Sequence, residues 1–158
     1  MSSTAQLRTL QTGHVGLNVT DLARSIAFYR AVFGLDVTAE GTDPDRRYAF
    51  LGRDGRLMVT LWQQSAGRFA PGNPGLHHLS FEVESLDEVR ATERLLRELG
   101  AEFAYDGVVP HSEGSASGGI FFTDPDGIRL EVYTRTGVAG TEAAAPAPTA
   151  TAPTCGFF

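Results

Sequence analysis

The stretch GIFFTDPDGIRLEVY, at residues 119–133, consists of two short apolar runs joined by Asp-Pro-Asp-Gly. Pro125 fixes the backbone angle φ that one turn position requires, and Gly127 tolerates the positive φ that hairpin turns demand. The sequence therefore predicts that the two runs pair as the antiparallel strands of a hairpin.

The second arm of this hairpin has the alternation of a half-buried strand. Leu130 and Val132 fall on one face, and Glu131 falls on the other, between a cation and a phenol. A carboxylate on the inner side of a sheet needs a partner. His14 and His78 each begin another alternating run, and they are the candidate partners.

The hairpin closes the second of two similar halves. Residues 12–64 have the pattern of a strand, a helix and three strands, residues 65–75 form a linker rich in Gly and Pro, and the pattern returns over residues 76–135. The runs HVGLNV (14–19) and HLSFEV (78–83) share the same phase of apolar and polar residues. The sequence therefore predicts one α+β domain built from tandem βαβββ modules.

Both predicted helices carry matching end signals. Asp21 and Ser85 are placed as N-caps, and Glu88 completes a capping box with Ser85. Gly34 and Gly100 are placed to end the helices, because glycine accepts the left-handed backbone of a C-terminal cap. In the second module, the segment that follows the helix is predicted to supply the next strand.

Composition limits the partners of the chain. At 158 residues and 42% hydrophobic content, it is long enough for one core and too short for two typical domains. The net charge is −6 and all 13 basic residues are scattered arginines, so neither nucleic acid nor a membrane surface is expected as a partner. No leader, spanning segment or disulfide pair is recognised, and Cys155 is the one cysteine. A cytoplasmic protein is the expectation.

Two flanking segments lie outside the repeat. Residues 1–11 are polar and aperiodic and are predicted to be a loose lead-in. Residues 136–158 are rich in Ala, Pro and Thr, and we predict that they are disordered because they bury too little apolar surface to offset their ordering entropy. For the terminal Phe157 and Phe158, the composition favours a chain end without a role. Docking of these residues on the fold is the alternative.

Paired βαβββ units of this kind, with a His-Val-Gly-Leu-Asn-Val strand first and an Asp-Pro-Asp-Gly hairpin ahead of a Glu-bearing strand, resemble the vicinal oxygen chelate superfamily. This superfamily includes glyoxalases, extradiol ring-cleaving dioxygenases, fosfomycin-modifying enzymes and bleomycin-binding proteins. The resemblance covers roughly residues 12–135 and implies the glyoxalase fold, with its modules forming a metal-binding cleft. Carried over position by position, it implies His14, His78 and Glu131 as the metal ligands.

The implied ligand set points to a class of reaction. Two imidazoles and one carboxylate form a facial triad that suits Fe(II), with Mn(II), Zn(II) and Ni(II) as alternatives, and it leaves positions for a chelating substrate and O₂. The fourth family position falls at Met58 or Val59, which do not bind a hard divalent ion, and this counts against a glyoxalase. The resemblance therefore favours an Fe(II) extradiol-type dioxygenase acting on a small substrate with vicinal oxygens.

Two further residues are candidates for catalysis. The Ser- and Gly-rich loop carrying His111 is compatible with a surface residue and with an acid or base. The phenol that dioxygenases place before the Asp-Pro turn is replaced by Phe121, and Tyr133, or else Tyr105, is the candidate substitute. Arg129 is expected to pair with a carboxylate or with an anionic substrate.

Other functions remain open at this point. A glyoxalase, isomerase or lyase on the same scaffold is one alternative, and fosfomycin-modifying enzymes also use two His and one Glu, although this chain has no Lys. A metal-free small-molecule binding protein of the bleomycin-resistance kind is another. A homodimer is expected, and in a binding protein of the bleomycin-resistance kind the dimer would form the site.

Overall fold

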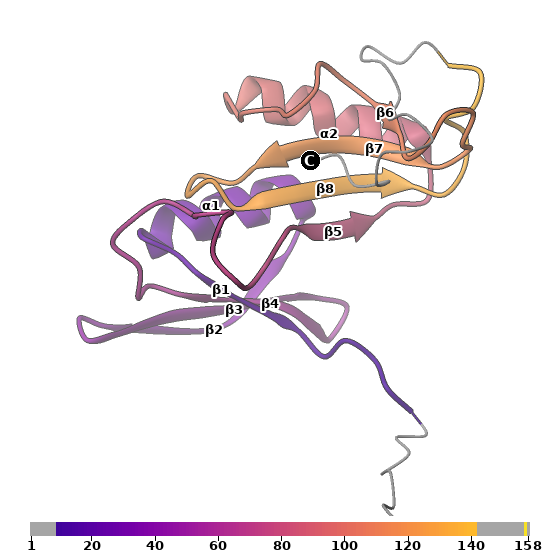
Figure 1. Ribbon diagram of the computed structural model, residues 1–158. Coiled ribbons are helices and arrows are strands. Elements are labelled where there is room, and N and C mark those ends of the chain that lie inside the picture. Colours follow the sequence, from indigo (N-terminus) through magenta and orange to yellow (C-terminus); the bar gives the residue numbers. More distant parts are fainter. Residues whose placement is uncertain (1–8, 142–156, 158) are drawn as a thin grey trace, which may run out of the picture. The chain divides into compact units, whose positions relative to one another are not determined.

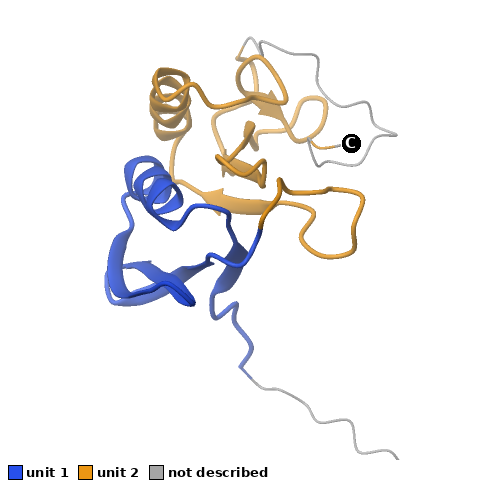
Figure 2. Ribbon diagram, turned by 90° about the vertical axis from the view of Figure 1, so that its left-hand side faces the viewer, with its two compact units in different colours: residues 1–65 blue, residues 66–158 orange. Residues whose placement is uncertain are grey.

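The computed structural model describes residues 9–141 and Phe157. It forms two compact units, residues 1–65 and residues 66–158, coloured separately in Figure 2. Each unit contains one helix and one four-stranded sheet, as labelled in Figure 1. The predicted α+β class and the repeated strand–helix–strand order are confirmed.

In the first unit, helix α1 covers one face of a mixed sheet. The elements are β1 (Val15–Asn18), α1 (Leu22–Phe33), β2 (Asp36–Asp43), β3 (Arg46–Arg53) and β4 (Arg56–Trp62). The strand order is β1-β4-β3-β2, with β1 parallel to β4 and the other pairs antiparallel. The helix packs against β3 and β4, and Tyr29 is fully buried.

The second unit repeats this arrangement. Its elements are β5 (Leu79–Glu82), α2 (Leu86–Glu98), β6 (Val109–Pro110), β7 (Gly118–Thr123) and β8 (Arg129–Thr134), in the sheet order β5-β8-β7-β6. Helix α2 packs against β7 and β8 through the buried side chains of Val89 and Leu96. Leu130, Ile120 and Phe122 of the sheet are fully buried as well. The core of this unit therefore lies between α2 and its sheet.

The helix caps have the predicted chemistry. The Asp21 carboxylate accepts a hydrogen bond from the backbone N–H of Arg24 at 3.0 Å. Ser85 and Glu88 form a reciprocal capping box at the start of α2. Gly34 has φ 61°, which a glycine adopts without strain when it closes α1.

The hairpin between β7 and β8 is also confirmed. The buried Asp124 carboxylate accepts hydrogen bonds from the backbone N–H groups of Asp126 at 2.8 Å and Ile128 at 2.9 Å. Gly127 has φ 83°, the positive angle that the turn requires. The turn fixes the register in which Phe121 lies opposite Glu131.

The second unit differs from the sequence prediction after α2. The segment expected to form the next strand makes only an isolated bridge between Phe103 and Phe122. The edge strand is instead the two-residue β6, paired with Gly118 and Gly119. Pro110 has no N–H to donate to a longer ladder, which limits this strand.

The described chain stays on the fold beyond residue 135. Val138, in the segment assigned to the tail, is 3% exposed, and its N–H donates to the carbonyl of Ala116 at 3.0 Å. Residues 1–8, 142–156 and 158 lie outside the described residues, so the predictions for them are not tested. No helix in the described part has the length and apolar character to span a membrane.

Candidate active site

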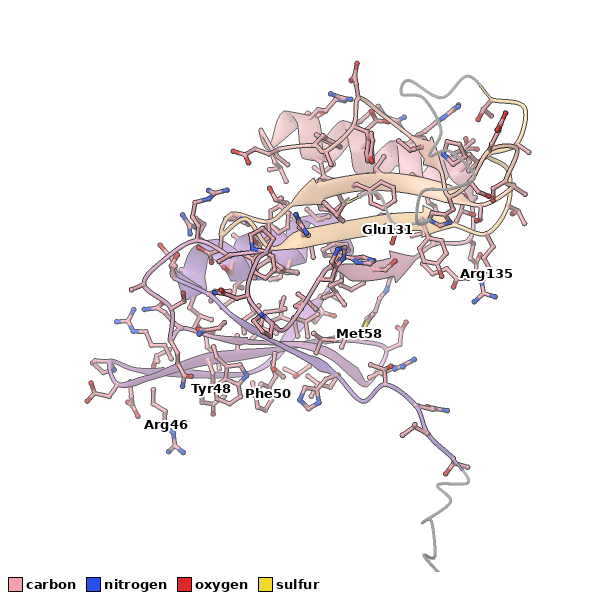
Figure 3. The ribbon with its side chains drawn as sticks, in the orientation of Figure 1. Arg46, Tyr48, Phe50, Met58, Glu131 and Arg135 are labelled. Atoms are coloured by element: carbon pink, nitrogen blue, oxygen red, sulfur yellow. The ribbon has the colours of Figure 1, made fainter. Side chains whose placement is uncertain are left out.

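Glu131, which is labelled in Figure 3, lies at the centre of a polar cluster in the second unit. It lies on β8, between Ser80 of β5 and Phe121 of β7, and its side chain is 8% exposed. One carboxylate oxygen, Oε1, accepts a hydrogen bond from Nε2 of His111 at 2.6 Å. The other, Oε2, lies 3.5 Å from Nε2 of His78. The buried carboxylate thus has an imidazole at each oxygen.

His78 immediately precedes β5, and its side chain is 25% exposed. Burial lowers the pKa of His78 from its ordinary value, although Glu131 acts in the opposite direction. This shift favours the neutral imidazole, which is the form with a lone pair to offer. Its Nδ1 lies 2.9 Å from Nδ1 of His77, so one of these nitrogens donates and the other accepts.

The pair His78 and Glu131 fits a divalent ion in its donor chemistry. A neutral imidazole and a carboxylate are ligands that Zn(II), Fe(II) and Mn(II) accept. Two ligand atoms about 2.1 Å from one ion at a tetrahedral angle are about 3.4 Å apart. The observed separation of 3.5 Å between Nε2 and Oε2 matches that spacing.

His111 is held by its own loop as well as by Glu131. Because a carboxylate only accepts, Nε2 of His111 carries the hydrogen of their short bond. Nδ1 lies 2.8 Å from Oγ of Ser117, which lies 3.2 Å from Oγ of Ser115. The backbone N–H of His111 also donates to the carbonyl of Ser117 at 3.0 Å. Of the two settings compatible with the sequence, the structure places His111 in the cluster and not in an isolated surface loop.

Tyr133 belongs to a neighbouring network that the sequence did not reveal. Its phenol donates to Oε2 of Glu82 at 2.9 Å, and Glu82 also accepts two hydrogen bonds from Arg135, at 2.7 and 3.0 Å. Burial, followed by the bond to Glu82, raises the pKa of Tyr133. The bonds from Arg135 and then Tyr133 lower the pKa of Glu82.

The phenol of Tyr133 therefore points to Glu82 in this structure. Its ring lies 5.3 Å from the ring of His111, so the two networks are adjacent. The signal in the sequence that could have identified this contact is the alignment of the two strands. In the parallel pairing of β5 and β8, Glu82 lies beside Tyr133. The catalytic role of Tyr133 remains a prediction.

An apolar wall flanks Glu131 on the β7 side. The ring of Phe121 lies 5.9 Å from the ring of Tyr105 and 6.4 Å from that of His111. Phe121 is 2% exposed and has no group that bonds a substrate oxygen. The phenol expected from dioxygenases is therefore absent from this position.

His14 is exposed and immediately precedes β1 in the first unit. Within the described residues, no group of three or more His, Cys, Asp or Glu side chains is placed to hold a metal ion. The structure thus brings together two of the three predicted ligands, His78 and Glu131. The contribution of His14 remains a prediction.

Strand register corrects the fourth ligand position. Ser80 pairs with Glu131 in the second unit, and the corresponding pair in the first unit is Gly16 and Thr60. The antiparallel neighbours agree, because Phe121 faces Glu131 and Phe50 faces Thr60. The equivalent of Glu131 is therefore Thr60, and the assignment to Met58 or Val59 was wrong.

Thr60 is 1% exposed, and its hydroxyl accepts a hydrogen bond from Nε1 of Trp62 at 2.9 Å. Trp62 stacks on Tyr48 at 5.4 Å between ring centroids, and Phe50 contacts both rings. Figure 3 labels Tyr48, Phe50 and Met58 in this sheet. The position that carries a carboxylate in the second unit therefore carries a neutral hydroxyl beside three aromatic rings in the first.

Comparisons with known proteins agree with this architecture. The profile of the Glyoxalase/Bleomycin resistance protein/Dioxygenase superfamily matches residues 11–132. The trivalent organoarsenical cleaving enzyme of Bacillus sp. (strain MD1) is 35% identical over 131 residues, covering 82% of this chain and 76% of the relative. The lactoylglutathione lyase of Haemophilus influenzae is 30% identical over 132 residues, covering 77% and 90%.

Solved structures have the same fold. A glyoxylase/bleomycin resistance protein/dioxygenase domain from Frankia sp. EAN1pec has a TM-score of 0.69 and 26% identity, covering 82% of this chain and 95% of that one. A point mutant of the fosfomycin resistance protein FosX from Listeria monocytogenes, complexed with Mn(II) and 1S,2S-dihydroxypropylphosphonic acid, has a TM-score of 0.63 and 22% identity, covering 83% and 95%.

Proposed function

The chain belongs to the glyoxalase/bleomycin resistance protein/dioxygenase superfamily, and we propose that it is a divalent-metal-dependent enzyme acting on a small substrate with two neighbouring oxygens. The proposed ligands are His14, His78 and Glu131. The observation that carries the proposal is the buried carboxylate of Glu131, with the imidazole of His78 at one oxygen and that of His111 at the other.

The side chains have distinct roles in this proposal. His78 and Glu131 supply a nitrogen and an oxygen to the ion, and His14 supplies the second imidazole. When bound, a divalent ion lowers the pKa of substrate oxygens that coordinate it. His111 holds a proton at Nε2, hydrogen-bonded to Glu131, and is the group placed to give it to a reacting oxygen or to take one back. Its loop, through Ser117, orients the ring.

The finer proposal is an Fe(II) extradiol-type dioxygenase. The facial set of two imidazoles and one carboxylate supports it, because Thr60 adds no carboxylate and positions remain for a chelating substrate and O₂. Since Phe121 offers no hydrogen bond, plain catechols are expected to react slowly, and a substrate bearing its own polar group is expected to react better.

A lyase or isomerase is the second candidate. Two observations favour it: relatives at 30–35% identity are a lactoylglutathione lyase and an organoarsenical cleaving enzyme, and the dioxygenase phenol is missing. Both candidates use the same ligands, so the reaction with O₂ separates them.

The metal is tested first. Full-length protein purified without oxygen is expected to contain about one Fe(II) or Mn(II) per chain by elemental analysis. His78→Ala is expected to lose the ion, whereas the control Glu102→Gln, at an exposed carboxylate 3.6 Å from Arg68, keeps it. Unchanged metal content in His78→Ala would reject the ligand set, and no metal in any preparation would favour a metal-free binding protein.

The reaction is tested next with Fe(II)-loaded protein and an oxygen electrode. The panel contains catechols, α-keto acids, 2-hydroxy acids and a trivalent organoarsenical. Conversion coupled to O₂ uptake is the result expected of the dioxygenase. Metal-dependent conversion without O₂ uptake would reject it in favour of the lyase or isomerase.

A further inference from the structure

The ring of Phe157, close to the C-terminus, lies in the candidate active site. Its centroid is 5.5 Å from that of Phe121 at an interplanar angle of 86°, and 5.9 Å from that of His78. The guanidinium carbon of Arg129 lies 5.3 Å from the centre of the same ring. All contacts are made within the second unit.

These three side chains surround Glu131. Phe121 faces Glu131 across the β7–β8 pair, and Nε2 of His78 lies 3.5 Å from its carboxylate. Arg129 is two residues before Glu131 on β8 and therefore lies on the same face of the strand. The ring of Phe157 thus occupies space beside the carboxylate on which the proposed chemistry depends.

The geometry is that of a site for an aromatic ring. The edge-to-face contact with Phe121 is a preferred arrangement for two rings. A guanidinium within about 6 Å of a ring centroid is attracted by the negative face of the ring. No carboxylate among residues 9–141 forms an ion pair with Arg129. The guanidinium of Arg129 instead lies over the ring of Phe157.

We propose that Phe121, His78 and Arg129 form a subsite for an electron-rich aromatic ring of the substrate, and that Phe157 is an occupant tethered to the chain, which the substrate displaces. The identification of the ligand as a substrate rests on the proposed function, whereas the subsite itself does not. An electron-rich ring such as a phenolate gains more from the Arg129 cation than Phe157 does. Phe157 is only half-buried, so exchange does not require the core to open.

The tether has a measurable consequence. A ligand that must displace an occupant has its apparent affinity reduced by the fraction of molecules in which the site is open. If Phe157 fills the subsite in about nine of ten molecules, removal of its ring strengthens ligand binding about tenfold. Loss of the Arg129 cation weakens binding of an aromatic ring about threefold to tenfold and leaves a saturated ring almost unaffected.

The experiment uses full-length protein freed of metal, with 2-naphthol as the probe and decahydro-2-naphthol as its saturated counterpart, in isothermal titration. Neither probe chelates a metal through two oxygens, so the result is independent of the metal assay. Phe157→Ala is expected to bind 2-naphthol about tenfold more tightly than the wild type. Phe157→Ala combined with Arg129→Ala is expected to lose most of that gain for 2-naphthol only.

Phe103→Ala is the matched control, because Phe103 also lies under an arginine: Cζ of Arg97 is 4.7 Å from the centre of its ring. Unlike Phe157, however, Phe103 lies on the other face of the sheet. It should leave 2-naphthol binding unchanged. A 4-fluorophenylalanine placed at position 157 reports displacement directly, because its ¹⁹F resonance should move toward that of an exposed ring when 2-naphthol saturates the site.

Two results would overturn the proposal: equal affinity of Phe157→Ala and the wild type for 2-naphthol, or equal affinity of both probes for Phe157→Ala. An unchanged ¹⁹F resonance at saturation would reject displacement even if a variant failed to fold. If the subsite is found but the protein contains no metal, the proposed function fails and the subsite stands. The reverse outcome rejects the subsite alone.

Discussion

Replacing Glu131 by glutamine tests the site through stability, without any substrate. The wild-type carboxylate accepts a hydrogen bond from His111 at 2.6 Å in a position where its side chain is 8% exposed. A hydrogen bond to a charged group contributes about 1.5–3 kcal/mol and a neutral one about 0.5–1.5 kcal/mol. Because the glutamine oxygen still accepts from His111, Glu131→Gln is expected to lower the free energy of unfolding of metal-free protein by about 1–1.5 kcal/mol.

Added metal should enlarge this difference. A ligand at about 100 times its dissociation constant stabilises the folded state by about 2.7 kcal/mol, provided that it binds the folded state alone. The wild type is expected to gain this amount with Mn(II), and Glu131→Gln almost none, so the gap grows to about 4 kcal/mol. Urea unfolding with Mn(II) and with EDTA measures both gaps.

The control for this measurement is Glu102→Gln, since Glu102 is an exposed carboxylate 3.6 Å from Arg68. It should change the stability by less than about 1 kcal/mol, and equally with and without metal. If Glu131→Gln gained as much stability from Mn(II) as the wild type, Glu131 would not be a metal ligand, and the proposed function would lose the observation on which it rests.

Two other predictions concern the surroundings of the site. Glu82→Gln is expected to lower the raised pKa of Tyr133, so that phenolate absorbance near 295 nm rises at a lower pH. Tyr133→Phe identifies the part of the signal that belongs to Tyr133. An unchanged pKa would mean that burial alone raises it. Because the folded-state pKa of Tyr133 is raised, its contribution to stability is present below about pH 10 and is lost as the pH rises through the folded-state value. Leu96→Ala, at a fully buried contact of α2, is expected to cost about 2–5 kcal/mol in urea unfolding, and a loss below about 1 kcal/mol would contradict the packing of α2 on β7 and β8.

The parts of the fold that the sequence predicted are determined by local interactions. The turn at Asp124 is formed by hydrogen bonds within five residues, and the capping box of Ser85 spans four. Such signals are complete in a short stretch of sequence, because every partner is nearby in the chain. The hairpin, both helices and the repeat could therefore be predicted from the amino-acid pattern alone.

The contacts of the site depend on longer distances along the chain. His111 is 20 residues from Glu131 and reaches it through a loop whose closure depends on Ser115 and Ser117. Hydroxyl side chains in a Gly-rich loop are equally compatible with a solvated loop, so the sequence left the role of His111 open. The contact between Phe157 and Arg129 was missed for the same reason, since no periodicity marks a single ring near a chain end.

The error at Met58 has a specific cause. The segments Arg-Leu-Met-Val (56–59) and Arg-Leu-Glu-Val (129–132) have similar sequences, and this similarity aligned Met58 with Glu131. The paired strands align Thr60 with Glu131 instead. The two alignments differ by two residues, and a shift of two keeps every side chain on the same face of a strand. Apolar alternation therefore fits both alignments equally. The irregularity of register between Leu51 and Gly52 is a tertiary feature that the pattern does not encode.

Thr60 also affects the charge of the proposed centre. With a hydroxyl instead of a second carboxylate, and with that hydroxyl bonded to Trp62, Glu131 is the one anion in the proposed ligand set. A divalent ion held by two neutral imidazoles and one carboxylate keeps a net positive charge, which an anionic chelating substrate neutralises better than a neutral one does. Arg129 adds a second positive charge on the Glu131 face of β8. Both features favour a substrate that carries negative charge on its vicinal oxygens, which is the form that coordination itself promotes by lowering their pKa.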